Sequence, residues 1–411
     1  MSLGMLIKFH REKKELTQEE LGRGICSVTH ISKIERGITQ YSSEITSMIS
    51  DKLGIHLENE LESLHEYERM LDQWHDSMIM QQNSEMDRLK TEIEKHPLFL
   101  IHSIKNKYTL LHARYLLHQG DLARANKLLA KMNFERKELN TYECNLLHHL
   151  LGMAKILSGN FKEALEYLLK INERDYHNQE FYHQIAISYL NLQLKVKAYY
   201  YSELALEHFR RTSNYKKVID AETIKLISEG RNELWDFEEL VARYQRLIAQ
   251  CEMINEKTKK ASLLSNLAYE YAFREENNKA ADFYKKTLEL LQANPRSPVY
   301  LNNLIGYIYC SLQNDIADTD LDLAELIEKG KHLSKLIEDH SSFMFFQMLN
   351  LLEKKEMGAY YEFIEKNIIP MLEKSGKIHQ LRTYEKTMYQ HYMEIGNHLK
   401  ALEYANRLIK D

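Results

Sequence analysis

A turn-forming residue followed five positions later by an alanine recurs along most of this chain, and this recurrence is the strongest constraint on its fold. In each case the alanine would open the second helix of a pair. Weaker units centre on three further positions. We call these three positions and the five alanines the anchors of the repeats, and successive anchors lie 34 to 44 residues apart. Such a period is typical of stacked helix pairs. The five strong sites are Gly120/Ala125, Gly159/Ala164, Gln193/Ala198, Glu275/Ala280 and Gly396/Ala401, and the weaker ones are Leu240, Ala324 and Ala359.

The block from Leu267 to Leu290 matches the tetratricopeptide repeat closely. In that repeat, small residues let the two helices of a pair touch, while larger apolar residues fill the layer to the next pair. The whole chain of 411 residues has only 4 Pro and 14 Gly, so we expect helices nearly throughout. The predicted fold is therefore all-α, with about eight degenerate repeats in a right-handed superhelix over residues 97–411. An irregular helical bundle is the alternative.

The segment Leu16–Gly37 predicts two short helices that cross at a tight turn. Thr17 and Glu20 have the spacing of a capping box, in which each satisfies a backbone N–H near the start of the first helix. Small or capping residues mark the turn and the start of the second helix, namely Gly22, Gly24 and Ser27. We expect a DNA-binding module over residues 1–57.

The second helix of this segment would bury Ile31 and Ile34, which turns a short, polar side outward. We expect that side to meet base edges, with Lys33 placed for a guanine contact and His30 able to contact bases or phosphates. Residues at the two ends of the motif would hold phosphates. A small helical bundle without a nucleic-acid role is the alternative. The predicted DNA-binding residues are Gln18, Val28, Thr29, His30, Ser32, Lys33 and Arg36.

Charge is distributed unevenly along the chain, although the net charge is only −5. Residues 1–57 carry eight Lys and Arg against seven Asp and Glu, whereas residues 58–96 carry four against eleven. The second stretch is amphipathic and has no Gly or Pro, which predicts an acidic helical connector. Its excess charge would repel DNA or hold the DNA-binding module inactive, or it is simply a solvated helix face.

The sequence lacks the features of an enzyme, a metal site or a membrane protein. It has no Gly-rich phosphate loop, no His-Glu-x-x-His and no nucleophile motif, so we expect no catalytic activity and no cofactor. The four cysteines form no Cys-x-x-Cys pair, and the adjacent His148 and His149 would face different sides of one helix, so no metal site is expected. Without a signal peptide or a long apolar run, a cytoplasmic protein is expected.

The run Ile31 to Gly37, Ile-Ser-Lys-Ile-Glu-Arg-Gly, resembles the helix-turn-helix of phage-repressor type, with one residue fewer in the turn than the commonest pattern. Together with the repeats, the chain resembles the RRNPP family of Gram-positive peptide-pheromone receptors, of the neutral-protease-regulator and phospholipase-regulator types. The resemblance implies a quorum-sensing transcription regulator that binds double-stranded DNA, in which a short signalling peptide in the concave groove controls DNA binding. The alternative is an interaction scaffold that sequesters a response-regulator protein. We also expect a homodimer that reads two half-sites.

An extended peptide needs partners for its backbone N–H and C=O groups, and asparagine offers a donor and an acceptor together. In the register of the repeats, one face of each first helix would line the groove. We expect Asn266 and Asn303 to anchor the peptide backbone and Arg114 to meet a peptide carboxylate. The alternative is that these side chains are merely solvated or pair with the next repeat. The predicted peptide-binding residues are Arg114, Asn191, Asn266, Tyr269, Asn302, Asn303 and Tyr307.

Overall fold

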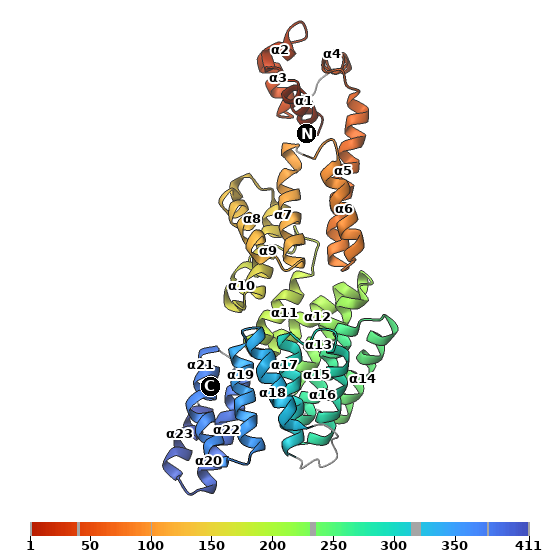
Figure 1. Ribbon diagram of the computed structural model, residues 1–411. Coiled ribbons are helices and arrows are strands. Elements are labelled where there is room, and N and C mark those ends of the chain that lie inside the picture. The colour runs from red at the N-terminus through yellow and green to blue at the C-terminus, as the bar shows by residue number, and fades with distance from the viewer. Residues whose placement is uncertain are drawn as a thin grey trace. The chain divides into compact units, whose positions relative to one another are not determined.

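The structure is a computed structural model that describes residues 2–38, 42–99, 101–230, 236–313, 322–375 and 378–409. The chain divides into two compact units, Met1–Ser228 (unit 1) and Glu229–Asp411 (unit 2). Every regular element in the described ranges is a helix, as expected for an all-α fold (Figure 1).

Unit 1 begins with a small helical module that has its own core. Its helices are α1 (Ser2–Lys13), α2 (Gln18–Gly22), α3 (Val28–Glu35), α4 (Ser43–Leu53) and the first turn of α5 (Leu57–Ile79). Gly4 lets α1 approach α3 closely, because a Cβ at this position would lie 2.1 Å from the carbonyl oxygen of Ile34. The core of this module consists of Ile7, Leu21, Ile31, Ile34, Ile49, Leu53 and Leu57.

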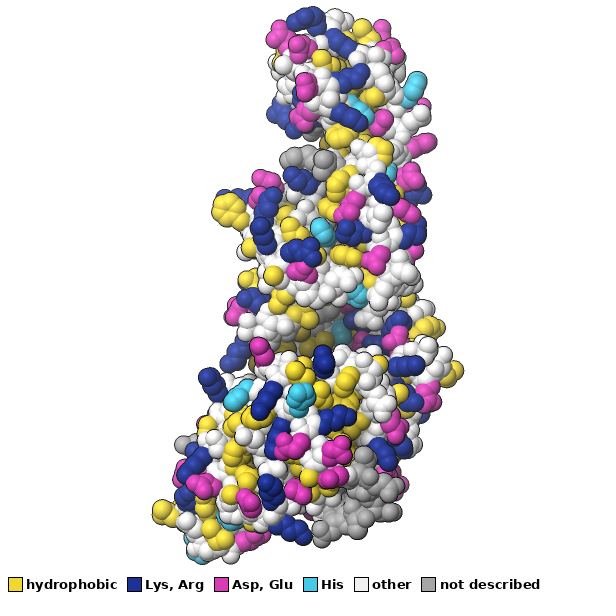
Figure 2. Space-filling model, in the orientation of Figure 1, with side chains coloured by type: hydrophobic (Ala, Val, Ile, Leu, Met, Phe, Trp, Pro, Cys, Tyr) yellow, Lys and Arg dark blue, Asp and Glu magenta, His cyan; other side chains and the backbone are white. Residues whose placement is uncertain are grey.

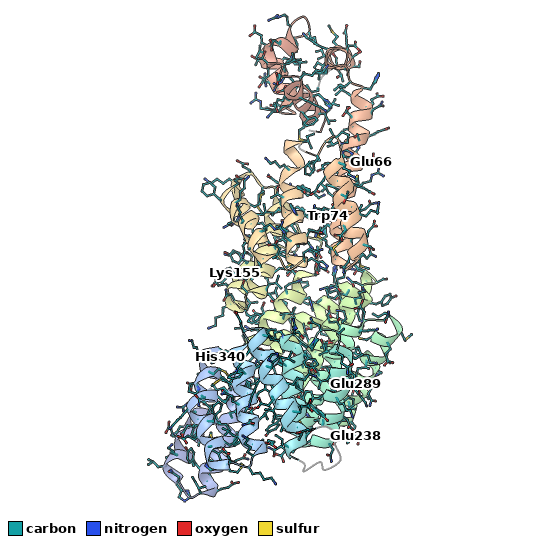
Figure 3. All side chains as sticks on the ribbon, viewed as in Figure 1. Glu66, Trp74, Lys155, Glu238, Glu289 and His340 are labelled. Carbon is teal, nitrogen blue, oxygen red and sulfur yellow. The ribbon has the colours of Figure 1, made fainter. Side chains whose placement is uncertain are left out.

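The acidic stretch 58–96 is two packed helices rather than one continuous amphipathic helix. Helix α5 ends at Ile79, and α6 (Asn83–Lys95) follows after a tight turn in which Gln81 has a φ of 55°. The two helices contact each other side by side (Figure 1). Trp74 on α5 (Figure 3) is fully buried. The centroid of its ring lies 5.9 Å from those of Tyr108 and Tyr115 on α7. The connector is thus part of the core of unit 1.

Eight consecutive helix pairs follow in the described ranges, which confirms the repeat architecture. Each predicted anchor lies on the second helix of a pair, and we call the two helices of a pair A and B. The pairs are α7 (His102–His118) with α8 (Leu122–Phe134), α9 (Thr141–Leu157) with α10 (Phe161–Leu168), α11 (Phe181–Asn191) with α12 (Lys195–Arg211), α13 (Tyr215–Glu229) with α14 (Phe237–Met253), α15 (Lys257–Phe273) with α16 (Asn277–Leu291), α17 (Pro298–Gln313) with α18 (Leu323–Leu336), α19 (His340–Glu353) with α20 (Met357–Phe363), and α22 (Ile378–Glu394) with α23 (His398–Ile409). A 3₁₀ turn, η1 (Arg136–Glu138), precedes α9, and α20 continues through a π-helical turn, η2 (Ile364–Ile368), into α21 (Ile369–Ser375).

The five predicted turn residues all adopt a left-handed conformation, with φ between 60° and 78°. Such a conformation ends helix A and lets helix B fold back against it. The alanines five positions later are all buried, as is Leu240. Two weaker anchors were placed wrongly: Ala324 is half-buried and Ala359 is exposed, while Ile327 and Tyr360 fill the corresponding core positions. The sequence lacks the pattern of a turn residue followed by alanine in those two units. It therefore did not indicate which residue of helix B faces the core.

The helix pairs of unit 2 curve so that the A helices come closest to one another. Helix α17 contacts both α15 and α19 directly, whereas the B helices α14, α16 and α18 stand further apart. The accessible side of the A helices is therefore the inner side of the curve in this unit. None of the helices in the described part of the chain has the length and apolar character needed to span a membrane.

Candidate functional site

The DNA-binding candidate is built on the caps that the sequence predicted. The backbone N–H of Glu20 donates to Oγ1 of Thr17 (3.1 Å), and the N–H of Thr17 donates to Oε2 of Glu20 (2.8 Å), so the capping box is formed. Ser27 caps α3 by accepting from the N–H of His30 at 3.3 Å. Between the helices, Gly24 has a φ of 82°, a conformation that favours glycine. These contacts fix the angle at which α3 leaves the turn.

Helix α3 presents the polar side that was predicted from the burial of Ile31 and Ile34, both of which are fully buried. Thr29, Lys33 and Arg36 are exposed, and Val28 is 43 % exposed. The guanidinium of Arg36 also donates to the carbonyl of Ser32 at 3.1 Å, which holds it along the end of the helix. The remaining predicted residues, Gln18, His30 and Ser32, are half-buried.

Glu35 joins the first three helices, a role that the sequence analysis did not foresee. Its carboxylate accepts two hydrogen bonds from Arg11 on α1, at 2.6 and 3.1 Å, and one from the amide of Gln18 on α2 at 2.8 Å. The hydrogen bond to Glu35 outweighs the cost of burial and raises the pKa of Arg11. One of the two N–H donors of Gln18 is thus used inside the module.

Helix α5 starts in the core of the DNA-binding module and continues into the rest of unit 1. Near its start, Glu60 forms a hydrogen bond with the ring of His10 on α1 at 2.9 Å. Over the face of the molecule drawn in Figure 2, basic and acidic side chains alternate on this module. The charge pattern agrees with the sequence in showing no broad basic surface there.

Arg114, which was predicted to meet a peptide carboxylate, is instead 3 % exposed and paired inside unit 1. Its Nη2 lies 2.5 Å from Oε2 of Glu180, and its Nη1 donates to Nε2 of His75 at 3.2 Å. Lys217 approaches the other oxygen of Glu180 at 3.7 Å. Burial acts to raise the pKa of Glu180, but Arg114 and Lys217 outweigh it and hold the pKa well below its usual range. Because this guanidinium already has a carboxylate partner, we do not include Arg114 among the proposed peptide ligands.

The accessible side of the A helices in unit 2 carries some of the predicted peptide-binding residues but not others. Asn266 and Tyr269 on α15 are half-buried and Asn302 on α17 is exposed, while neither asparagine side chain hydrogen-bonds to a described residue. The placement of Asn303 and Tyr307 on this side is corrected, since they are only 2 % and 5 % exposed and face the core.

Asn191, on α11 in unit 1, is exposed, but its side-chain amide donates to the carbonyl of Ile187 on its own helix at 2.9 Å. The predicted peptide-binding residues are therefore not brought together as one set. Those that share an accessible side are Asn266, Tyr269 and Asn302.

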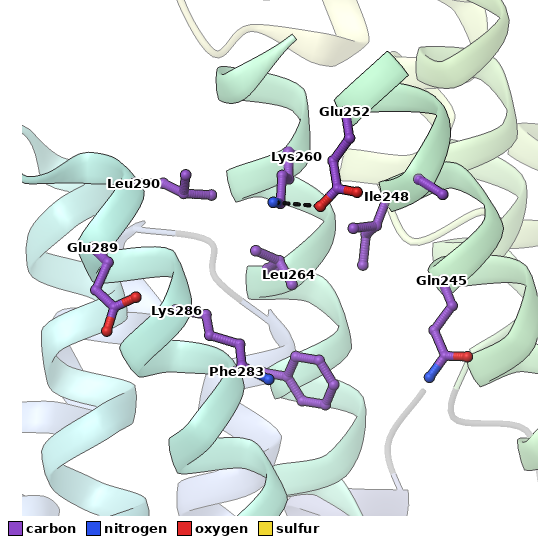
Figure 4. A pocket seen from close by; sticks show the side chains of 10 residues that line it. Gln245, Ile248, Glu252, Lys260, Leu264, Phe283, Lys286, Glu289 and Leu290 are labelled. Carbon is purple, nitrogen blue, oxygen red and sulfur yellow. Dashed lines mark hydrogen bonds and ion pairs between the residues drawn. The ribbon is translucent and has the colours of Figure 1, made fainter. Parts of the chain in front are cut away.

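A pocket of about 450 Å³ lies on the opposite side of α15, between the B helices α14 and α16 (Figure 4). Leu264 lines it and lies two residues from Asn266, which corresponds to about 200° around the helix axis. At its rim, Lys260 pairs with Glu252 at 2.6 Å. None of the predicted peptide-binding residues lines this pocket. Nowhere in the described ranges do three or more His, Cys, Asp or Glu side chains gather in a way that could hold a metal ion.

Comparison with known proteins finds similarity at the N-terminal end of the chain and over most of its length. The sequence model of the helix-turn-helix family matches residues 7–58, which span α2, α3 and the core around them. Residues 7–58 form a helix-turn-helix domain. No curated protein sequence matches the chain.

Solved structures are similar to the chain over most of its length. The apo form of the quorum sensor NprR from B. thuringiensis is 22 % identical, with a TM-score of 0.69 over 84 % of this chain and 98 % of NprR. NprR in complex with its cognate peptide NprX gives a TM-score of 0.65 at the same identity and coverage. A Rap protein complexed with competence and sporulation factor is 14 % identical, with a TM-score of 0.69 over 84 % of this chain and 97 % of that protein. The fold is that of the RRNPP peptide-pheromone receptors.

Proposed function

We propose that this protein is a transcription regulator whose helix-turn-helix domain binds double-stranded DNA under the control of a short signalling peptide. The observation that carries the proposal is the geometry of α3, which is capped by Ser27 and packed through Ile31 and Ile34 so that its polar side is free. The likeness to NprR, solved with and without a peptide, supports the second half of the proposal. A soluble regulator of this kind would act in the cytoplasm.

In this proposal the exposed residues of α3 read bases and the residues at the ends of the motif hold phosphates. Thr29 and Lys33 reach base edges, together with Val28 and Ser32, and His30 contacts either bases or phosphates. Arg36 and Gln18 contact the DNA backbone. Because one domain has a charge of only +1 over residues 1–57, we propose that two copies act together as a homodimer on two half-sites.

Lys33→Ala is expected to relax base preference at one position, at a cost of about 1–3 kcal/mol, because a lysine that contacts a base discriminates between sequences. Arg36→Ala should weaken binding to all sequences alike and reduce the salt dependence, because a phosphate contact carries no sequence information. Both can be measured by selection from randomised DNA duplexes followed by titration at several salt concentrations. Exposed Lys127 on α8 offers a matched control. Equal loss on all sequences for Lys33→Ala would contradict its assigned role.

We propose that the peptide binds on the inner side of unit 2, where Asn266 and Asn302 hydrogen-bond to its backbone and Tyr269 packs beside it. The test is whether short peptides encoded beside the gene change the affinity of the protein for the DNA selected above. A change on addition of one such peptide supports the proposal. Peptide binding without any DNA binding would favour the alternative function, a scaffold that sequesters a response-regulator protein. A protein that binds DNA but none of the peptides would leave only the first half of the proposal.

A further inference from the structure

Helix α23 in unit 2 carries an apolar stripe that no described element covers (Figure 1). Leu399, Leu402 and Ile409 form this stripe, and they are 84 %, 61 % and 78 % exposed. Ile395, which lies just before the helix, is also exposed. Large apolar side chains that gather on one face of a folded unit mark a surface for interaction.

The other side of α23 is fixed inside unit 2, so the direction of the stripe is fixed as well. Ala401 and Tyr404 are buried. Nζ of Lys400 pairs with Oε1 of Glu365 at 3.0 Å, and the hydroxyl of Tyr404 donates to the same oxygen at 3.3 Å. These contacts hold α23 against the preceding helices and leave the stripe facing outward.

The corresponding side of helix B is covered in other pairs of the array. Helices α10, α16 and α18 each pack against the A helix of their own pair and against the A helix of the next pair, whereas the main contact of α23 among the described helices is α22. Leu165 on α10 and Ala281 on α16 directly follow their anchors, as Leu402 follows Ala401, yet they are only 9 % and 5 % exposed. The stripe is therefore a packing surface of the array without a described neighbour.

The spacing along this side of α23 favours a second helix as the neighbour. Leu399, Leu402, Asn406 and Ile409 lie three, four and three positions apart, which is the spacing of helices that pair along their length. Asn406 is exposed and makes no hydrogen bond to a described residue. A single asparagine among apolar positions fixes the register of such a pair, because its amide needs a matching polar group. In a pair of identical helices, the second Asn406 supplies that group.

The charges beside the stripe also suit a second copy of the chain. Arg407 pairs with Glu373 at 2.8 Å and with Glu403 at 3.5 Å. Because these charges already compensate one another, two identical faces meet without a surplus of like charge. A strongly charged partner would find no surplus of opposite charge to attract it.

The apolar area is large enough to contribute substantially to a dimer. If the stripe and Ile395 lose their exposed surface in both copies, about 300–700 Å² of apolar surface becomes buried. A standard interface of about 1,600 Å² is a little more than half apolar. The stripe therefore supplies about a third or more of the apolar surface that a stable dimer needs.

We propose that this side of α23 is the surface through which two copies of the protein associate, with the apolar residues of the two copies packed together and the two Asn406 amides hydrogen-bonded to each other. The inference rests on the homodimer of the proposed function. It goes further because it assigns the surface and gives its residues opposite effects. The leucines stabilise the dimer, whereas the asparagine selects the register at a cost in affinity.

The test is sedimentation velocity of the whole chain over a range of concentrations, which measures the dissociation constant of the dimer. Leu399→Glu and Leu402→Glu should each raise this constant about a hundredfold or more, because each change occurs twice in the dimer and places a carboxylate in apolar surroundings. Asn406→Leu should instead lower it about tenfold or produce larger oligomers, because it removes the polar pair that limits affinity and selects the register.

Leu336→Glu is the matched control, because Leu336 is an exposed leucine on another B helix, α18, and its replacement should leave the dissociation constant within about twofold. Circular dichroism during thermal unfolding would show that each variant folds. Unchanged association in both Leu399→Glu and Leu402→Glu would overturn the interface while leaving the homodimer intact. Weaker association in Asn406→Leu would contradict the pairing of the two asparagines. If the parent protein is a monomer at every concentration, with and without DNA, the proposed homodimer fails together with the interface.

Discussion

Replacing Arg114 with methionine is expected to destabilise unit 1 by about 3–5 kcal/mol, because it leaves the carboxylate of Glu180 buried without its main partner. Glu180 is only 2 % exposed, and its remaining cation, Lys217, lies 3.7 Å away. Urea unfolding at neutral pH can measure the effect through the fluorescence of Trp74, which is fully buried in the same unit. The second tryptophan, Trp235, lies outside the described residues and would be replaced by phenylalanine in every sample.

Two further variants separate the buried pair from a general effect of losing an arginine. In the double variant Arg114→Met with Glu180→Leu, much of the stability should return, since no unpaired carboxylate remains. Arg88→Met removes an arginine that pairs with Glu85 and Glu92 on the surface, and it should leave the stability nearly unchanged. A loss below about 1 kcal/mol for Arg114→Met would show that the pair does not hold the helices of unit 1 together.

Local features of this fold could be predicted from sequence because their causes lie within a few residues. Thr17 and Glu20 of the capping box lie three positions apart, and each of the five predicted turn residues lies five positions before its alanine. The same is true of the burial of Ile31 and Ile34, which follows from helical spacing.

Contacts between distant residues were not predictable in this way. Arg114 meets Glu180 across 66 positions, and Arg11 meets Glu35 across 24, so no local pattern marks either pair. The prediction of the groove residues was partly wrong for a different reason. Asn302 and Asn303 are adjacent, and an error of one position in the register changes the direction of a side chain by about 100° around the helix axis. Asn302 is exposed, whereas Asn303 faces the core.

Mild acid is expected to destabilise unit 1 more than unit 2, because most of the histidines whose pKa is lowered by burial lie in unit 1. A histidine in the unfolded chain binds a proton when the pH falls below about 6.5. A histidine that is buried in its neutral form binds a proton only when the pH falls below its own, lower pKa. Stability is therefore unaffected above that pH and falls as the pH drops toward the folded pKa. The histidines of unit 1 with a lowered pKa are His75, His96, His112, His118, His148, His149 and His208, whereas unit 2 has His391.

His149 shows how much stability unit 1 can lose through one buried histidine when the pH is lowered. It is fully buried, burial lowers its pKa to about 4, and its Nδ1 forms a hydrogen bond with the hydroxyl of Tyr176 at 2.9 Å. Between a pH of about 7.5 and a pH of about 5, this residue alone should cost unit 1 about 2 kcal/mol. Burial raises the pKa of Glu143 and Asp76, and their earlier protonation offsets part of the total loss.

The measurement is the urea midpoint reported by Trp74 at the two pH values, in the background without Trp235. His149→Gln removes one titrating group, so it should make the midpoint less dependent on pH even if it lowers stability at neutral pH. His65→Gln is the control for the substitution itself, because it makes the same change at a histidine that is exposed on α5. A urea midpoint that stayed constant between the two pH values in the parent protein would contradict this prediction. It would mean that the buried histidines of unit 1 do not take up more protons in the unfolded chain than in the folded one.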